Sequence, residues 1–271
     1  MAETVKVGII GCGTIGSEIA RACDGVLRGC FRVEALYDID PGKSGSLAGV
    51  IGCNKVTRDM DELIAVSDLV VEAAGAAAAP AALAKAIEMK RAILIMSVGG
   101  LLGSESLLEK ARVSGVDVYL PSGAIAGLDG IKAASMAGIE KVTLTTRKPP
   151  KGLEGAPYLA DKNINLAGIS EDTVVFDGSA KEAVSAFPKN INVSAVLSLA
   201  GIGADKTRVR IVAVPGLTKN IHEVVVEGPF GVIRTATENV PSPSNPKTSY
   251  LAVLSAIAAM KSIAGTVKIG T

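Results

Sequence analysis

Two short segments of this 271-residue chain carry residues suited to chemistry, and they complete each other. The first is Gly11-Cys12-Gly13-Thr14-Ile15-Gly16, directly after an apolar run at residues 5–10. A strand, glycines at this spacing and then a helix are typical of a loop that binds the pyrophosphate of a dinucleotide. The second segment, at 219–223, contains the only histidine of the chain, His222. The unperturbed pKa of histidine lies near neutral pH, so this segment could move a proton.

Each position of the glycine motif has an expected task. Gly11 allows a tight turn, and Gly13 lets the backbone approach a pyrophosphate. Gly16 lets the following helix pack closely, with phosphate at the helix N-terminus. We assign Gly11, Gly13, Thr14 and Ile15 to cofactor binding; the alternative is a glycine-rich structural turn.

A carboxylate at the end of the second expected strand indicates which dinucleotide is bound. Asp38 follows Gly16 by 22 residues, near the position that hydrogen-bonds the adenosine ribose in such folds. A carboxylate there favours NAD and repels the 2'-phosphate of NADP, so NAD is the preferred cofactor and NADP a possible one. Asp40 competes for the same role.

Three further segments contain candidate site residues. Asn220 and His222 share one face of an alternating segment and could position a polar substrate. Two amides, Asn190 and Asn192, precede an expected buried helix, where they either cap the helix or bind cofactor or substrate. Small residues around Ala124 would let the backbone approach a flat ring, unless they form only a tight turn. Gly75, Ser97 and Gly99 follow expected strands and either line the cofactor site or simply begin helices.

An α/β framework is needed to hold these residues. Over the first 120 residues, short apolar β-rich runs alternate with helical stretches. Strands are expected at 5–10, 33–37, 69–73, 92–96 and 117–120. Helices are expected at 15–27, 60–66, 80–89 and 104–114. This alternation predicts a parallel sheet covered on both faces, and therefore an N-terminal Rossmann dinucleotide-binding domain.

The regular alternation of expected strands and helices ends after Pro121. Helices are expected at 125–134 and 192–200, and strands at 142–147, 173–176, 208–214, 223–227 and 232–237. Short loops with Gly or Pro between several of these strands favour antiparallel pairing. Residues 241–246 contain three prolines and are expected to form a hinge or linker before a long apolar helix at 248–263.

These patterns predict an α/β protein with two domains. Residues 1–121, completed by 242–271, would form the Rossmann NAD(P)-binding domain. Residues 122–241 would form an inserted α+β domain for catalysis and dimerisation, after which the C-terminal helix returns to the Rossmann domain. The sequence leaves open whether this helix packs on that domain or between subunits.

Composition excludes several classes of function. A formal net charge of +1 gives no basic field for nucleic acid. We find no apolar run of about 18 residues that would span a membrane. The four cysteines form no CxxC pair, which argues against a metal site or a disulfide framework and favours a reducing cytoplasm.

Taken together, the motifs resemble the L-aspartate dehydrogenase family. The matching segments are GIIGCGTIG at 8–16, LPSGAIAGLDG at 120–130, FPKNINVSA at 187–195 and NIHEV at 220–224. They occur in the family's order over nearly the whole chain. The resemblance implies oxidation of L-aspartate with NAD or NADP to iminosuccinate, which hydrolyses to oxaloacetate and ammonia or feeds quinolinate synthase on the way to NAD. It also implies a homodimer.

The resemblance assigns roles to particular residues. His222 matches the active-site histidine, and Ala124 and Asn190 match residues that contact the cofactor. The two substrate carboxylates need donors, for which the sequence offers five unranked candidates, with Asn192 and Asn220 retained as substrate-binding residues. The five are Asn190, Asn192, Lys219, Asn220 and Arg234. We expect the pKa of His222 to lie near the working pH, so that it can serve as a base.

Other classes of protein remain as alternatives. A homoserine dehydrogenase, which relies on a lysine, is a related enzyme of similar architecture. A non-catalytic NAD-binding sensor would bind the cofactor without turnover. A phosphorylating semialdehyde dehydrogenase needs a nucleophilic cysteine, yet no cysteine lies beyond Cys53, and a dihydrodipicolinate reductase needs a histidine-rich segment.

Overall fold

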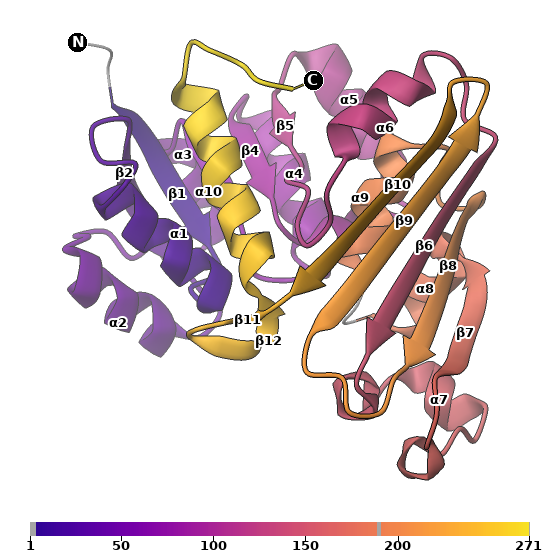
Figure 1. Ribbon diagram of the computed structural model, residues 1–271. Coiled ribbons are helices and arrows are strands. Elements are labelled where there is room, and N and C mark those ends of the chain that lie inside the picture. Colours follow the sequence, from indigo (N-terminus) through magenta and orange to yellow (C-terminus); the bar gives the residue numbers. More distant parts are fainter. Residues whose placement is uncertain (1–3, 189–190, 271) are drawn as a thin grey trace. The chain divides into compact units, whose positions relative to one another are not determined.

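Short apolar runs form a parallel sheet in a computed structural model of the chain, which describes residues 4–188 and 191–270 (Figure 1). The chain divides into two units, residues 1–121 with 253–267 and residues 122–252 with 268–271. In the described part of the first unit, the strand order is β2-β1-β3-β4-β5, with every pair parallel. The strands are β1 (Val5–Ile10), β2 (Phe31–Tyr37), β3 (Leu69–Glu72), β4 (Ala92–Ile95) and β5 (Val118–Tyr119). The Rossmann-type sheet expected from the alternating pattern is therefore confirmed.

Helices cover both faces of this sheet because its strands are apolar on both sides. Val7 and Ile9 of β1 join one buried cluster, and Ile10 joins the other. The helices that contribute to the first cluster are α1 (Thr14–Asp24), α2 (Pro41–Ile51) and α10 (Tyr250–Ala264). Those that contribute to the second are α3 (Met60–Val66), α4 (Ala79–Glu88) and α5 (Glu105–Ser114).

The C-terminal helix α10 packs on the first unit. Ala256 and Met260 are fully buried in the cluster that also holds Val7 and Ile9 of β1. These two residues therefore pack on the Rossmann-type unit, which is one of the two alternatives that the sequence left open. The preceding proline-rich segment is more ordered than a linker, because β11 (Pro241–Ser242) and β12 (Asn245–Ser249) pair as a small antiparallel hairpin.

A buried carboxylate organises the loops at the carboxyl ends of β3 and β4. Glu72 is fully buried, and its Oε1 accepts hydrogen bonds from the backbone N–H groups of Ala74 and Gly75 at 2.8 and 2.9 Å. Ser97 donates its backbone N–H to Oε2 at 3.1 Å and its hydroxyl to Oε1 at 2.9 Å. Burial raises the pKa of Glu72, and these four hydrogen bonds oppose that rise.

The second unit contains a mixed sheet with the order β10-β9-β6-β8-β7 in its described part. Its strands are β6 (Lys141–Lys148), β7 (Thr173–Ser179), β8 (Thr207–Ala213), β9 (Asn220–Gly228) and β10 (Gly231–Asn239). Strands β9 and β10 form a hairpin, and β6 pairs antiparallel with β9. Strands β6 and β8 are parallel, so the antiparallel pairing expected for several of the strands does not extend to this pair. Their connection contains β7 and three α-helices, which is long enough for a parallel crossover.

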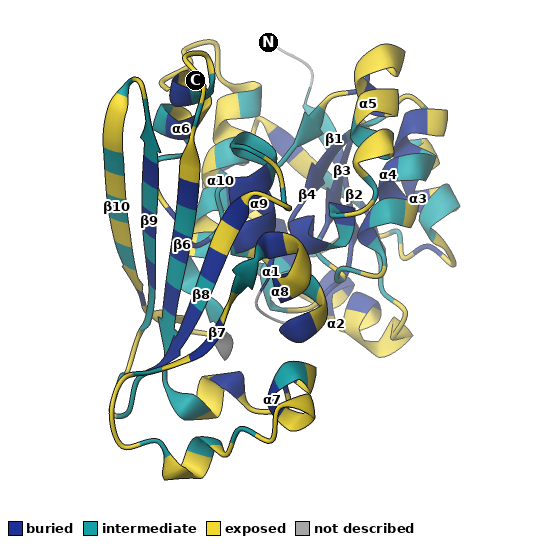
Figure 2. Ribbon diagram, turned by 90° about the vertical axis from the view of Figure 1, so that its right-hand side faces the viewer, coloured by how far each residue is buried: buried dark blue, intermediate teal, exposed yellow. Residues whose placement is uncertain are grey.

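Helices cover one face of the second sheet. They are α6 (Leu128–Ser135), α8 (Ala180–Ala186) and α9 (Asn192–Ala200), while the five-residue α7 (Pro157–Asp161) lies beside α8. Gly201, at the end of α9, lies beside the side chains of Val142 and Ile131, so the covered face is the face of β6 that carries Val142. Figure 2 shows the resulting alternation of buried and partly exposed residues along β6 and β9.

No helix within residues 4–188 and 191–270 is both long enough and apolar enough to cross a bilayer.

Replacing Glu72 should test its role in joining the two loops. Glu72→Leu keeps a side chain of similar size but removes the acceptor of three backbone N–H groups, of which that of Ser97 is buried. We expect the free energy of unfolding to fall by about 3 kcal/mol or more, measured by urea denaturation. The control Glu88→Leu, at an exposed position, should change stability by about 0.5 kcal/mol at most. Equal stability of the two variants would show that Glu72 has no organising role.

Candidate functional site

The glycine loop of the first unit leaves no room for larger side chains at two of its glycines. Gly11 has φ +94°, and a Cβ there would overlap the backbone of Ala73 and Ala74. A Cβ on Gly16 would overlap the carbonyl oxygen of Gly11. These contacts pack the start of α1 tightly against the ends of β1 and β3, as expected for a dinucleotide-binding turn.

Gly13 is different, because the space around it is open. It is exposed and precedes α1, and no atom lies within 4 Å of the position that its Cβ would occupy. No side chain caps the helix at this end, so the N–H groups of the first turn are not bonded to a capping side chain. Thr14 and Ile15 begin that turn and are partly exposed. Open space before a helix N-terminus fits the pyrophosphate of a dinucleotide.

Asp38 lies beside this loop. Its carboxylate accepts hydrogen bonds from the backbone N–H groups of Cys12 at 2.7 Å and Asp40 at 2.9 Å. Asp40 instead caps α2, because its carboxylate accepts a hydrogen bond from the backbone N–H of Gly42 at 3.0 Å. The structure thus brings Asp38 to the glycine loop and gives Asp40 a capping task. Burial, with the negative charge of Asp38, raises the pKa of the Cys12 thiol to about 12, so this cysteine is not a nucleophile at neutral pH.

Of the three residues that follow expected strands, two share one partner. Gly75 and Ser97 both bind Glu72, so the ends of β3 and β4 are joined. Gly99 lies in a short 3-10 helix, Val98–Leu101, and is buried. Their hydrogen bonds give the first two a structural task.

His222 lies on the helix-covered face of the second sheet. It is 6% exposed, and its Nδ1 lies 3.0 Å from Oγ1 of Thr146, the residue opposite it on β6. Residues 220, 222 and 224 share this face, as the alternating sequence predicts, whereas Ile221 and Glu223 lie on the other. Which atom of the pair donates depends on the tautomer of the imidazole.

The loop that contains Ala124 is attached to the same sheet. The carbonyl oxygen of Ala124 accepts hydrogen bonds from the hydroxyl of Thr237 at 2.7 Å and from the amide of Asn239 at 3.0 Å. Thr237 pairs with His222 in the register of β9 and β10. Two of the segments picked out in the sequence, more than 90 residues apart, therefore meet in one unit.

The amides predicted in the sequence are placed as follows. Asn220 begins β9 on the His222 face and is partly buried. Asn192 is the first residue of α9 with an exposed side chain, and the residue that caps this helix is Ile191, so the capping alternative is wrong for Asn192. Asn190 lies outside the described residues.

Two cationic candidates lie away from His222. Arg234 is exposed on β10 and alternates with Thr235 and Thr237, so it belongs to the opposite face of the sheet. Lys219 is exposed and pairs with Glu238 at 3.1 Å, a residue of that same opposite face. Neither of these two candidates for binding a substrate carboxylate therefore lies on the His222 face.

Lys148 is a cation on the His222 face that sequence reasoning missed. It is the last residue of β6, two positions after Thr146, and its strand pairs with β8 up to this point. Burial lowers the pKa of Lys148 to about 8. The expected strand at 142–147 stops one residue short of Lys148; extending the alternation of Val142, Leu144 and Thr146 by one step would have revealed it.

The expectation that the pKa of His222 lies near the working pH is wrong. Burial lowers the pKa of His222 to about 3, with a further contribution from the positive charge of Lys148. Both causes disfavour the imidazolium ion, so the ring is neutral at pH 7. Sequence alone shows neither the burial nor the neighbouring cation.

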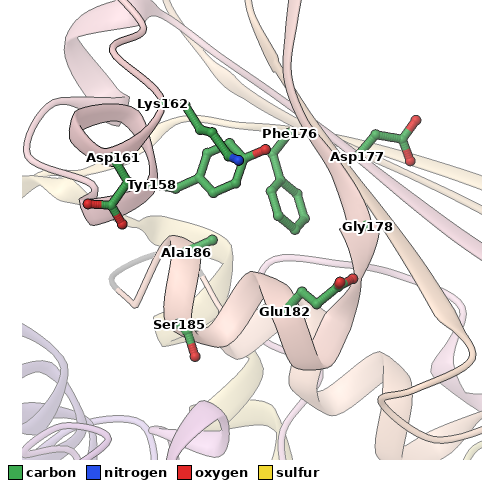
Figure 3. Close-up of a pocket in the computed structure, with 9 residues that line it drawn as sticks. All are labelled: Tyr158, Asp161, Lys162, Phe176, Asp177, Gly178, Glu182, Ser185 and Ala186. Carbon is green, nitrogen blue, oxygen red and sulfur yellow. The ribbon is translucent and has the colours of Figure 1, made fainter.

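A hollow of about 530 Å³ lies at the β7 edge of the second sheet, between α7 and α8 (Figure 3). It is three strands from His222, roughly 14 Å at about 4.8 Å per strand. Three of its four charged side chains already have partners: Asp177 binds Arg208, Glu182 accepts from Ser179, and the Lys162 ammonium lies 5.9 Å from the ring centre of Tyr158. We therefore assign this hollow no part in the site.

Family models match both parts of the chain. Residues 11–121 match the NAD-binding domain of homoserine dehydrogenase. Residues 129–263 match the C-terminal domain of aspartate dehydrogenase.

Individual relatives agree along the full length. An L-aspartate dehydrogenase of Methanosarcina mazei is 47% identical, with 98% of this chain and 100% of the relative covered. One of Nitrosopumilus maritimus is 41% identical, over 98% of this chain and 99% of the relative. The crystal structure of aspartate dehydrogenase from Thermotoga maritima superimposes with a TM-score of 0.76 at 26% identity, covering 99% and 100% of the two chains. A scyllo-inositol dehydrogenase from Lactobacillus casei, with a TM-score of 0.55 and 16% identity, shares the fold alone; 99% of this chain and 90% of that chain are covered.

The lowered pKa of His222 predicts how stability depends on pH. Unfolded histidine protonates near its ordinary value of 6.5, whereas the folded protein resists protonation until about pH 3. The neutral ring therefore contributes stability above pH 6.5 that is lost as pH falls from 6.5 towards 3. At the steepest, this loss is about 1.4 kcal/mol per pH unit.

Urea denaturation at several pH values between 5 and 7 would measure this loss. The His222→Gln variant, which has no titrating group here, should lose less stability than the wild type over the same range. Parallel curves for the two proteins would contradict a lowered pKa.

Proposed function

The chain belongs to the L-aspartate dehydrogenase family, and we propose that it oxidises L-aspartate to iminosuccinate, which hydrolyses to oxaloacetate and ammonia. The observation that carries this proposal is His222, buried beside Thr146 on a polar part of the second sheet. Family membership makes the chain an oxidoreductase; the imine product and the residue roles below are our proposals.

A nicotinamide dinucleotide supplies the hydride acceptor when it is bound. We propose that residues 1–121 with 242–271 hold this cofactor and that residues 122–241 hold the substrate. Gly11, Gly13, Thr14 and Ile15 would bind the pyrophosphate, and the packing of the glycine loop supports this assignment. The resemblance adds Ala124 and Asn190 as cofactor contacts.

Asp38 supports a preference for NAD over NADP. Each of its oxygens already accepts one backbone hydrogen bond, and a carboxylate has about four acceptor sites. Asp38 can therefore still accept from two ribose hydroxyl groups, whereas a 2'-phosphate would be repelled.

His222 would act on the substrate amine. Aspartate must lose one amine proton before a hydride can leave its Cα, and the electron pair of the nitrogen then forms the C=N bond. A neutral imidazole can accept that proton if Nδ1–H donates to Thr146, because Nε2 then carries the free lone pair. Thr146 would thus act as a positioning residue that selects the tautomer. Asn192 and Asn220 are proposed as substrate contacts.

The wider setting is also a proposal. A homodimer fits the face of the second sheet opposite His222, where Val225 is partly exposed and Val232 is 49% exposed. The iminosuccinate would supply quinolinate synthase for NAD biosynthesis. The four cysteines are all free, which supports a reducing, cytoplasmic setting.

Turnover tests the proposed function directly. Purified protein with NAD and L-aspartate should produce reduced nicotinamide, measured by its absorbance. L-Homoserine, chosen because of the matching NAD-binding model, and L-malate serve as comparison substrates. His222→Ala should lower turnover by about 10²–10⁴-fold with unchanged affinity for NAD. Thr146→Val should also lower turnover, whereas Thr145→Val, on the opposite face of β6, should not.

Each of the other outcomes overturns a specific part of the proposal. Reduction with homoserine alone would replace the substrate. Full turnover by His222→Ala would reject the base, and cofactor binding without turnover on any substrate would favour a sensor.

Gly13→Ala tests the cofactor loop without disturbing the fold. Gly13 has φ −74° and open space around its Cβ position, so alanine fits the protein. A methyl group there should obstruct the pyrophosphate and raise the Kd for NAD by about 10-fold, or about 1.4 kcal/mol. Calorimetry would measure the Kd, and thermal unfolding should give an unchanged Tm. Gly45→Ala, also with open space, is the control. An unchanged Kd would remove Gly13 from the cofactor site.

A further inference from the structure

We propose that Lys148 is the cation that binds one carboxylate of a dicarboxylate substrate on the His222 face of the second sheet. This inference rests on the proposed function. It names a donor for one substrate carboxylate, which the sequence alone did not single out. It concerns His222, Thr146, Asn220 and Lys148, which we call the His222 patch.

The register of the sheet brings these four residues together. Thr146 pairs with His222, and Arg147 pairs with Ile221, which is the last pair between β6 and β9. One further step of the same register would set Lys148 opposite Asn220, the first residue of β9. Residues two apart on a strand point to the same face, so Lys148 follows Thr146 onto the His222 side.

The backbone of Lys148 is part of strand β6 and is hydrogen-bonded to the chain at the end of β8. The backbone N–H of Val214 donates to the carbonyl oxygen of Lys148 at 2.8 Å, and Lys148 pairs with Ala213 on β8. Two prolines follow at 149 and 150 and end the strand. The position of the side chain on this face is therefore fixed by hydrogen bonds on the β8 side.

The patch is small enough for one small molecule to contact both ionisable groups. Lys148 and His222 are diagonal neighbours on adjacent strands, a relation that places Cβ atoms about 7–8 Å apart, within reach of long side chains. A four-carbon dicarboxylate with an amine on one carbon could place a carboxylate at Lys148 and its amine at His222. Asn220, on the same face, adds an amide donor.

Charge provides the second argument. A buried ammonium is costly, and both Lys148 and His222 have a pKa below the ordinary value because of burial. A carboxylate bound at Lys148 would favour its charged form and offset the positive field at His222. The imidazole would then become more basic only when an anion is present. Binding of the anion and activation of the base would be coupled through one side chain.

Neighbouring cations do not offer the same site. Arg147 lies on the opposite face of β6 and pairs with Glu223 at 3.0 Å. Lys219 pairs with Glu238 on that same side. Among the lysines and arginines of β6, β8, β9 and β10, Lys148 is the one that follows the alternation onto the His222 face.

Binding of two unreactive anions tests the proposal. Succinate has two carboxylates and no amine, and succinamate has one carboxylate replaced by an amide. Calorimetry with the full chain saturated with NAD gives both Kd values. We expect the wild type to prefer succinate and Lys148→Met to weaken succinate binding by about 10- to 100-fold, with succinamate much less affected. Lys151→Met, an exposed lysine three residues away, is the control and should behave as the wild type.

The comparison separates an anion site from a structural role. A structural change would weaken both ligands and NAD binding equally, and Lys148→Gln gives the same comparison with a polar side chain. Wild-type protein that does not bind succinate, or Lys148→Met and Lys148→Gln that retain the preference, would overturn the proposal. Succinate binding that depends on Lys148 in a protein without aspartate turnover would support the anion site and reject aspartate as substrate.

Discussion

The site of the second unit depends on the requirement that polar groups buried under helices find hydrogen-bond partners. Thr146 binds His222, and Thr237 with Asn239 binds the carbonyl oxygen of Ala124. These contacts place a loop and two strands at fixed positions around one imidazole. A sheet face built only of valine and isoleucine would pack as well but would offer no side-chain hydrogen bonds to hold the Ala124 loop.

In the first unit, a single carboxylate, that of Glu72, provides hydrogen-bond partners for buried polar groups. Its parallel strands are buried on both faces. The loops that follow their carboxyl ends have backbone N–H groups without partners in the sheet. Glu72 supplies acceptors to two such loops at once. In both units, a buried polar side chain at the end of a strand therefore holds a loop by hydrogen bonds. Glu72 holds the loops after β3 and β4, and Asn239 holds the loop that contains Ala124. Four hydrogen bonds offset the desolvation penalty of Glu72.

The sequence predicted the features that depend on local pattern. The limits of β1, α3 and α9 and the face of His222 follow from apolar periodicity. Helix α2 was missed although Asp40 and Pro41 form a good start, because its eleven residues include three glycines and no clear apolar stripe. Helix α8 was missed although Ser179 and Glu182 form a capping box. The parallel pairing of β6 with β8, the place of Lys148 and the pKa of His222 depend on contacts between distant residues, which periodicity does not encode.

The β9–β10 hairpin turns through two residues, Pro229 and Phe230, between the paired Gly228 and Gly231. This loop length fixes how far β10 is displaced along β9. One inserted residue would shift every partner by one and turn Thr237 and Asn239 to the opposite face, away from Ala124. Evolution or design can therefore lengthen the connection between β6 and β7 more freely than this turn. The shortest loop of the sheet is the one whose length the chain can least change.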